Sequence, residues 1–286
     1  MILTLARGET YLRNLEDVPE PDREERLKSA LWVDVLQATH EEVALIQSTL
    51  KVELFDTEEL HEIEESSRVF IEKDDLNLVA WLPVFDSAVP TNLPVGFIVD
   101  NERLISTRNG DFHAFRVYAE PRRRSALPRV LTPAVLLVEV LDTIVGQLAS
   151  TLRSVEQDLN GLSLELFADH EPEGITNWGQ KNFRRLKSVV HRLGRRNALV
   201  ANLRESAVTL STLIPFIMKN GKTWIGEEAI ADLQILEQDL TSLRDYNAQL
   251  ASEISFLLDS TLGLISLDEN QAMKFLGVAA LIVAFV

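Results

Sequence analysis

The longest proline-free stretch of this sequence lies at its C-terminal end, and it constrains the fold more than any other feature. A helix that starts near Gly226 meets no proline before the last residue, Val286. If it is continuous, such a helix has about 61 residues and extends roughly 90 Å, at a rise of 1.5 Å per residue. No compact domain needs a helix of that length, so the sequence predicts a long stalk.

Two other long helices are predicted ahead of the stalk. The first covers residues 134–167, and Thr132 and Pro133 supply its N-cap and a proline at its first helical position. The second covers residues 177–219. The stretch before them, residues 120–129, contains three consecutive arginines and two prolines and is predicted to be a linker.

The first 130 residues alternate short apolar strands with capped helices, which is typical of a mixed α/β domain. Thr39 with Glu42, and Asp56 with Glu59, have the spacing of capping boxes, so each pair is predicted to open a helix. The predicted strands are residues 2–6, 31–36, 69–72, 78–83, 95–99 and 103–107.

Composition narrows the classes of partner. Lysine and arginine number 28 against 44 aspartate and glutamate, a formal net charge of −16, which disfavours a general binder of nucleic acid or anionic lipid. The natural partners of such a chain are cations. Because there is no cysteine, a metal site must use oxygen ligands or the five histidines, and there is no disulfide framework.

The last twelve residues, 275–286, carry no charge. An apolar run of this length is normally part of a buried core, whereas a membrane helix needs about 20 apolar residues. Two interpretations stay open at this point: a buried segment of a soluble helical scaffold, or the beginning of a membrane helix that the end of the chain cuts short. The run reaches the terminus without a polar residue or a C-cap, which favours the second.

Within the stalk, small and polar residues recur at alternating spacings of four and three, so they share one face of the helix. Most of the intervening positions are large and apolar. A face of this kind in lipid must point toward protein or water, so it is predicted to be either a helix-packing seam or a pore wall. We call it the small-residue face; it consists of Asp259, Gly263, Ser266, Asn270, Met273, Gly277, Ala280 and Ala284.

At these residues the sequence resembles the CorA family of magnesium and related divalent-cation channels. The segments ELHEIEESSRVFIEKDD, residues 59–75, and WVDV, residues 32–35, are similar to the α/β domain of that family. The segment STLGLISLDENQAMKFL, residues 260–276, is similar to its stalk, which enters the first membrane helix with a characteristic Asn-x-x-Met-Lys run. The resemblance covers essentially the whole chain.

The resemblance implies a homopentamer whose pore is lined by this helix from five subunits. The Gly-Met-Asn signature of the family would lie beyond residue 286, and a proline that many relatives carry near residues 284–286 is missing here. The ion is therefore open, with Mg²⁺ expected, Co²⁺ or Ni²⁺ as alternatives, and the zinc-transporting ZntB branch as a competitor. The pore-lining positions that the resemblance implies are Asp259, Asn270, Met273, Leu276, Gly277, Ala280 and Ala284.

The family senses cytoplasmic magnesium through carboxylates at subunit interfaces, so the resemblance also implies regulatory metal sites. A bound divalent cation would screen the repulsion between acidic subunits and hold the pore shut. No motif selects the ligands. The candidates are Asp74 and Asp75 in the α/β domain and Asp232, Glu237 and Asp239 on the stalk.

Two charged segments have plainer interpretations. The acidic run at residues 58–65 is explained by a solvated surface, with metal binding as the alternative. Residues 181–204 contain eight basic residues and no acidic one, and we expect them to pair with the acidic helix before them rather than with nucleic acid. No phosphate-binding loop, His-x-x-x-His pair or nucleophile elbow occurs, so no enzymatic activity is expected.

The sequence thus predicts an α+β fold: a mixed α/β cytoplasmic domain at residues 1–130, then long antiparallel helices with the stalk at residues 131–270. A truncated first membrane helix is expected at residues 271–286. The predicted function is that of a subunit of a pentameric divalent-cation channel in the inner (plasma) membrane, with Mg²⁺ or another divalent cation as both transported and regulatory ion, and no nucleic-acid partner.

Overall fold

The computed structural model describes residues 1–9, 11–60, 68–73, 75–84, 91–119, 131–168, 178–221 and 224–284, with backbone alone for residues 57, 178–182 and 268–284. These residues form two compact units. The first, which we call the sheet unit, is Met1–Ser150 with Asn202–Arg244; the second, the three-helix unit, is Thr151–Ala201 with Asp245–Val286. This division passes through all three long helices. The domain boundaries expected from the sequence lie at other residues, and they stay a prediction.

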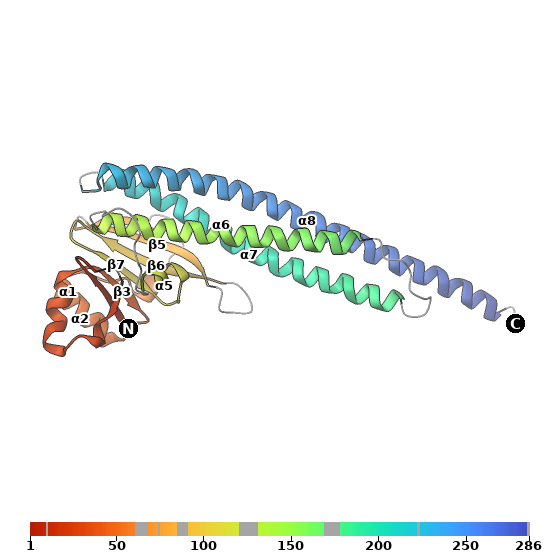
Figure 1. Cartoon of the computed structure of the whole chain (residues 1–286). Helices are drawn as coiled ribbons and strands as arrows, with labels where there is room; N and C mark the ends of the chain where they lie inside the picture. The colour runs from red at the N-terminus through yellow and green to blue at the C-terminus, as the bar shows by residue number, and fades with distance from the viewer. Residues whose placement is uncertain are drawn as a thin grey trace. The chain divides into compact units, whose positions relative to one another are not determined.

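The sheet unit contains a seven-stranded mixed sheet in the order β2-β1-β3-β7-β6-β5-β4. Figure 1 labels β3, β7, β6 and β5 of this sheet. Only β3 and β7 pair in parallel among the described strands. The strands are β1 Ile2–Ala6, β2 Arg13–Asn14, β3 Ala30–Leu36, β4 Val69–Glu72, β5 Asp75–Val84, β6 Thr91–Val99 and β7 Leu104–Arg108.

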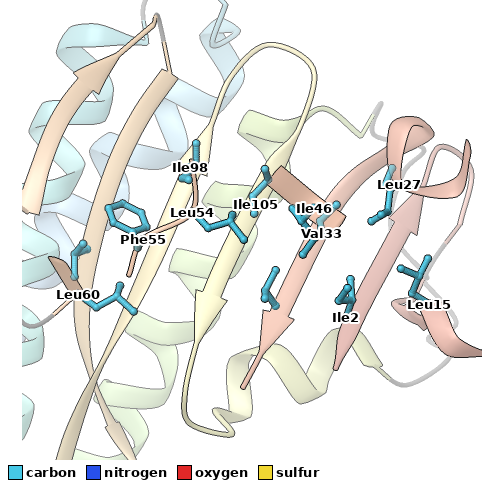
Figure 2. Close-up of a cluster of buried hydrophobic side chains, with 13 residues drawn as sticks. Ile2, Leu15, Leu27, Val33, Ile46, Leu54, Phe55, Leu60, Ile98 and Ile105 are labelled. Atoms are coloured by element: carbon cyan, nitrogen blue, oxygen red, sulfur yellow. The ribbon is translucent and has the colours of Figure 1, made fainter. Parts of the chain in front are cut away.

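One face of the sheet is covered by short helices, and Figure 2 shows the apolar cluster between them. Val33, Ile98 and Ile105 come from three neighbouring strands, and Ile46 and Leu60 come from helices. All five side chains are almost fully buried. The helices of the first sixty residues are η1 Leu15–Asp17, η2 Glu20–Asp22, α1 Arg23–Ser29, α2 His40–Leu50 and α3 Thr57–Leu60.

The other face of the sheet carries aromatic side chains and a buried ion pair. Trp32 and Phe97 pack against Phe115 of α5, His113–Ala119, with ring centroids 5.9 and 6.2 Å apart. Asp34 of β3 lies opposite Ser106 of β7 in the parallel pair. Arg108 follows Ser106 by two residues, so its side chain lies on the same face of the sheet. Arg108 therefore reaches the Asp34 carboxylate, at 2.7 Å, and both side chains are buried.

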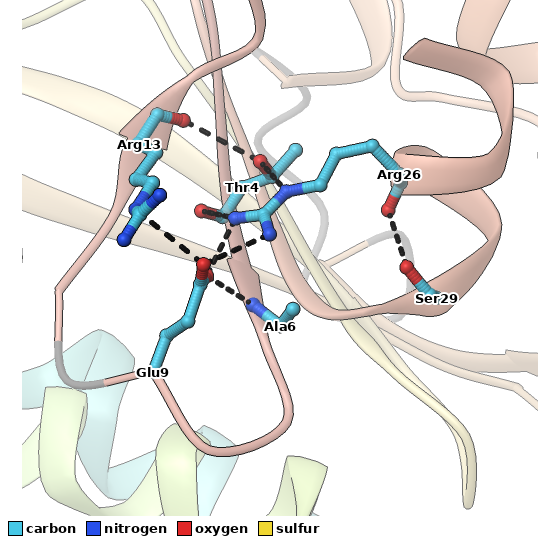
Figure 3. Close-up of polar contacts among 6 residues, drawn as sticks. All are labelled: Thr4, Ala6, Glu9, Arg13, Arg26 and Ser29. Atoms are coloured by element: carbon cyan, nitrogen blue, oxygen red, sulfur yellow. Dashed lines mark hydrogen bonds and ion pairs between the residues drawn. The ribbon is translucent and has the colours of Figure 1, made fainter. Parts of the chain in front are cut away.

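A second polar cluster fixes the first hairpin to α1 (Figure 3). Arg26 donates to the Glu9 carboxylate at 2.5 and 2.9 Å and to Thr4 at 2.9 and 3.1 Å. The Ala6 N–H also donates to Glu9, at 2.9 Å. Burial raises the pKa of Glu9, but the hydrogen bonds from Arg26 and Ala6 and the nearby positive charges outweigh it and lower that pKa overall.

The three long helices are α6 Pro133–Phe167, α7 Trp178–Asn220 and α8 Glu227–Ala284. Their bounds agree within a residue or two with the helices predicted from capping and proline signals, and α8 is continuous over 58 residues. Thr132 caps α6 by accepting a hydrogen bond from the Val135 N–H at 3.3 Å. The long stalk predicted from the missing proline is therefore confirmed.

The three-helix unit buries apolar residues at spacings of three and four from each helix, as in helix bundles. Leu159 and Leu162 of α6, Leu193 of α7, and Ile254 and Leu257 of α8 are all at most 1% exposed. Asn247 is a polar exception in this core: it is 2% exposed, and its Nδ2 donates to the Val200 carbonyl at 2.9 Å.

The mixed α/β sheet followed by long helices confirms the fold class predicted from the sequence. All six predicted strands occur, although β5 and β6 begin three and four residues earlier than expected. The predicted capping box at Thr39 and Glu42 is present and opens α2, which ends at Leu50. The sequence patterns missed the two-residue β2 and the short helices α1 and α5, whose apolar positions are too few to show a period.

Candidate ion-conduction and metal-binding surfaces

The described part of the small-residue face points away from the core of the three-helix unit. Asp259 and Gly263 are exposed, whereas Leu257 and Thr261, each two residues earlier in the helix, are buried. Ile254, Leu257 and Thr261 thus form the buried side of this part of the helix, and the described part of the small-residue face lies outside it. This face is available for a neighbour or for water, as a pore wall requires.

The rest of the small-residue face continues along the same helix. The α8 backbone is helical to Ala284, so Asn270, Met273, Gly277 and Ala280 keep the register with Asp259 that the sequence predicted. Their side chains, and those of Leu276 and Ala284, lie outside the described side chains. The structure thus supplies the helix and its register, and pore lining stays a prediction.

Two helices among the described residues are long and apolar enough to cross a membrane: Pro133–Phe167 and Glu227–Leu267. The first is 56% buried in its most apolar window, which is typical of a core helix, and the second only 22%. The more exposed of the two is thus the helix that carries the small-residue face.

Three carboxylates in the sheet unit act on one another across two helices. Asp142 belongs to α6, and Asp232 and Asp239 lie seven residues apart on one face of α8. Partial desolvation, followed by the negative charges of Asp232 and Asp239, raises the pKa of the Asp142 carboxyl above its ordinary value. Cation binding here would relieve this repulsion.

Asp232 and Asp239 are among the regulatory candidates expected from the sequence, whereas Asp142 is not. Nothing in the sequence marks Asp142, because its proximity to the stalk carboxylates depends on how α6 packs against α8. Of the other regulatory candidates, Glu237 is exposed, Asp75 is half-buried at the start of β5, and Asp74 lies outside the described residues.

No group of three or more histidine or carboxylate side chains among the described residues is close enough to chelate a metal ion. Of the acidic run at residues 58–65, Glu58 and Glu59 are exposed, and residues 61–65 lie outside the described part. Glu59 accepts a hydrogen bond from the Asp56 N–H at 2.8 Å, which is the predicted capping box of α3. The structure therefore gives this residue a capping role.

The expected pairing of the basic segment with the preceding helix is present for three arginines. Arg185 donates to the Glu165 carbonyl at 2.9 Å, and Arg192 forms an ion pair with the Glu165 carboxylate at 2.6 Å. Arg196 forms an ion pair with Asp158. The prediction is thus confirmed for these residues.

Comparison with known proteins agrees with this architecture. Residues 28–284 match the family described as CorA-like Mg²⁺ transporter protein. The chain is 26% identical over 281 residues to the magnesium transport protein CorA of Mannheimia succiniciproducens, covering 98% of this chain and 83% of that protein. It is also 26% identical over 257 residues to CorA of Haemophilus influenzae, covering 89% and 76% of the two chains.

Solved structures of related proteins share the fold. The complete CorA magnesium transporter of Methanocaldococcus jannaschii superposes with a TM-score of 0.69 at 17% identity, covering 99% of this chain and 83% of that chain. The cytoplasmic domain of ZntB from Vibrio parahaemolyticus superposes with a TM-score of 0.55 at 12% identity, covering 84% and 88% of the two chains.

The family of this chain follows from the match over most of its sequence, and the mixed sheet with the long helices agrees with it. The matched family consists of transporters of divalent cations and contains no enzymes, which favours ion transport over the soluble scaffold that the sequence alone left open. The chain belongs to the CorA-like Mg²⁺ transporter family.

Proposed function

We propose that this chain is a subunit of a homopentameric Mg²⁺ channel in the inner membrane, with its sheet unit in the cytoplasm and its pore formed by α8. The observation that carries the proposal is that the described part of the small-residue face, Asp259, Gly263 and Ser266, is exposed on a helix of 58 residues. The magnesium-transporting relatives support Mg²⁺ as the cargo. Co²⁺ and Ni²⁺ are the alternative ions.

In this proposal α8 enters the bilayer near residue 271 and contributes one wall of the pore. Carboxylate and amide oxygens such as those of Asp259 and Asn270 suit a hydrated divalent cation, because Mg²⁺ gives up its water reluctantly. Met273 and Leu276 would narrow the pore to an apolar constriction that closes by excluding water. Gly277, Ala280 and Ala284 would leave room along the axis. The driving force is the membrane potential, worth about 2.3 kcal/mol per charge for every 100 mV.

The test is cation flux in the membrane-embedded protein that carries this sequence. We expect Asn270→Ala and Met273→Ala each to change Mg²⁺ uptake into vesicles at least several-fold, since both positions face the proposed pore. Ile282→Ala is the matched control, because helical spacing places it on the opposite side of α8. Unchanged uptake in both pore variants would remove the pore assignment. Uptake of Zn²⁺ in preference to Mg²⁺ would instead favour a zinc transporter like the ZntB branch.

The same proposal includes regulation by divalent cations at carboxylates of the sheet unit. Asp232 and Asp239 on α8 are the candidates best supported by the structure, because both lie close enough to Asp142 for their negative charges to raise the pKa of its carboxyl. A cation held through its water shell would neutralise this cluster without direct chelation. Asp74, Asp75 and Glu237 remain candidates for the partner side of an interface between subunits. Loss of the cation would weaken that interface between subunits and allow the pore to open.

A further inference from the structure

The basic residues of α7 fall into two groups that differ in their partners. Arg185, Arg192 and Arg196 contact carboxylate or carbonyl oxygens of α6. Arg184, Lys187 and Arg195 are exposed and form no hydrogen bond or ion pair with any part of the chain that the structure describes. Internal pairing therefore accounts for only part of the basic segment.

The second group is arranged as a continuous line. Arg184, Lys187, His191 and Arg195 follow one another at spacings of three, four and four residues, so they share one face of α7. All four are exposed, and Leu186, Val189 and Leu193 on the other side of the helix are buried. We call these four residues the α7 basic strip; it extends about 16 Å along the helix.

The charge of the chain indicates what such a strip can bind. The residues of the three-helix unit include 9 Lys and Arg against 11 Asp and Glu, whereas those of the sheet unit include 19 against 33. Each copy therefore has a far larger excess of carboxylates outside the unit that carries the strip. A second copy of the chain is an anionic partner that is always present at the same concentration.

The direction of the strip disfavours a flat lipid surface as the partner. In the three-helix unit α7 runs alongside α8, and the bond from Asn247 to Val200 fixes their register (Figure 1). If α8 enters a bilayer at residue 271, Arg184 lies about 12 Å from the bilayer surface along the helix axis, and Arg195 lies about 28 Å from it. Charges are screened over about 8 Å at physiological ionic strength, so a bilayer would attract at most one end of the strip.

We propose that the α7 basic strip docks an acidic surface of a second copy of this chain. The inference rests on the proposed function only in requiring a homo-oligomer. Contact between a basic strip on one copy and a different, acidic surface on the next is heterologous, and heterologous contacts form a ring when the rotation from one subunit to the next closes. Such charge pairs set the register and the rate of association more than its affinity. The strip thereby selects how neighbouring subunits meet.

The experiment compares two triple variants by sedimentation velocity in detergent, at 50 and 500 mM salt. One carries Arg184→Gln, Lys187→Gln and Arg195→Gln. The control carries Arg204→Gln, Lys219→Gln and Arg244→Gln, three exposed basic residues of the sheet unit that likewise make no ion pair within the described residues. Both variants lose three positive charges. We expect the strip variant to self-associate at least ten-fold more weakly than the control at 50 mM salt, and the difference to vanish at 500 mM.

Equal self-association of the two variants at low salt would overturn the proposal while leaving channel function intact. Binding to vesicles that contain phosphatidylserine is the second readout, and a strip variant that loses vesicle binding but not self-association would also overturn it, in favour of lipid. An unaltered protein that stays monomeric at every concentration would contradict the pentamer itself, and with it this proposal.

Discussion

The buried ion pair between Asp34 and Arg108 is the most sharply defined feature at the scale of single residues. Asp34 is fully buried; its carboxylate also accepts a hydrogen bond from the Ser106 hydroxyl at 2.7 Å, and that hydroxyl accepts one from the Trp32 indole at 2.9 Å. The Arg108 guanidinium donates to the Gly110 carbonyl at 2.7 Å and lies 4.5 Å from the Phe115 ring centroid. All polar partners are thus supplied by the protein, which is what a buried charge requires.

Removing one partner of this pair should destabilise the sheet unit strongly. We expect Arg108→Leu to cost about 3–5 kcal/mol in the free energy of unfolding, because it leaves the Asp34 carboxylate buried without its countercharge. Urea unfolding followed by tryptophan fluorescence would measure the loss. The double variant Asp34→Leu/Arg108→Leu should recover much of the stability. Lys28→Ala, which removes an exposed pair with Glu24, should leave the unfolding midpoint unchanged. A double variant no more stable than the single one would contradict this account.

At the scale of whole elements, α6 and α8 carry both attraction and repulsion. In the three-helix unit Phe167 of α6 lies against Phe256 of α8, with ring centroids 6.4 Å apart. In the sheet unit Asp142 of α6 is repelled by Asp232 and Asp239 of α8. The same two helices therefore attract each other through apolar contacts in the three-helix unit, whereas carboxylates of like charge face each other in the sheet unit.

This repulsion gives the stability a pH dependence with a definite sign. Because the folded protein holds the Asp142 proton at a higher pH than the unfolded chain, this group makes stability fall as the pH rises through its raised pKa. We expect Asp142→Asn to raise stability at pH 7 by less than about 1 kcal/mol, since solvent screens an exposed group. The gain should disappear near pH 3, as measured by thermal unfolding at a series of pH values. A variant less stable than the parent at pH 7 would show that Asp142 makes a favourable contact instead.

At the scale of the molecule, the net charge of −16 means that cation binding should stabilise the folded protein. A cation that binds the folded protein but not the unfolded chain stabilises it by about 1.4 kcal/mol at ten times its dissociation constant. We therefore expect millimolar MgCl₂ to raise the melting temperature by several degrees. The comparison is with NaCl at equal ionic strength, which screens charge without specific binding. The variant Asp232→Asn/Asp239→Asn should lose most of the Mg²⁺-specific part. Equal shifts with both salts would count against a regulatory site in this cluster.

Local signals in the sequence determined the secondary structure of this chain. Thr39 and Glu42 opened α2, Thr132 and Pro133 opened α6, and the missing proline after residue 215 allowed α8 to continue, because caps and helix breakers act within a few residues. The spacing of Asp259, Gly263 and Asn270 likewise placed these residues on one face of a helix before any packing was known.

Which charges meet depends on how the helices and strands pack in three dimensions. The sequence does not bring Asp142 to Asp232, or Arg108 to Asp34 across 74 residues, because these contacts depend on helix packing and on which strands pair. It also could not divide the basic residues of α7 into those that reach α6 and those that face away. That division follows from the rotation of α7 about its axis, which burial of Leu186, Val189 and Leu193 fixes.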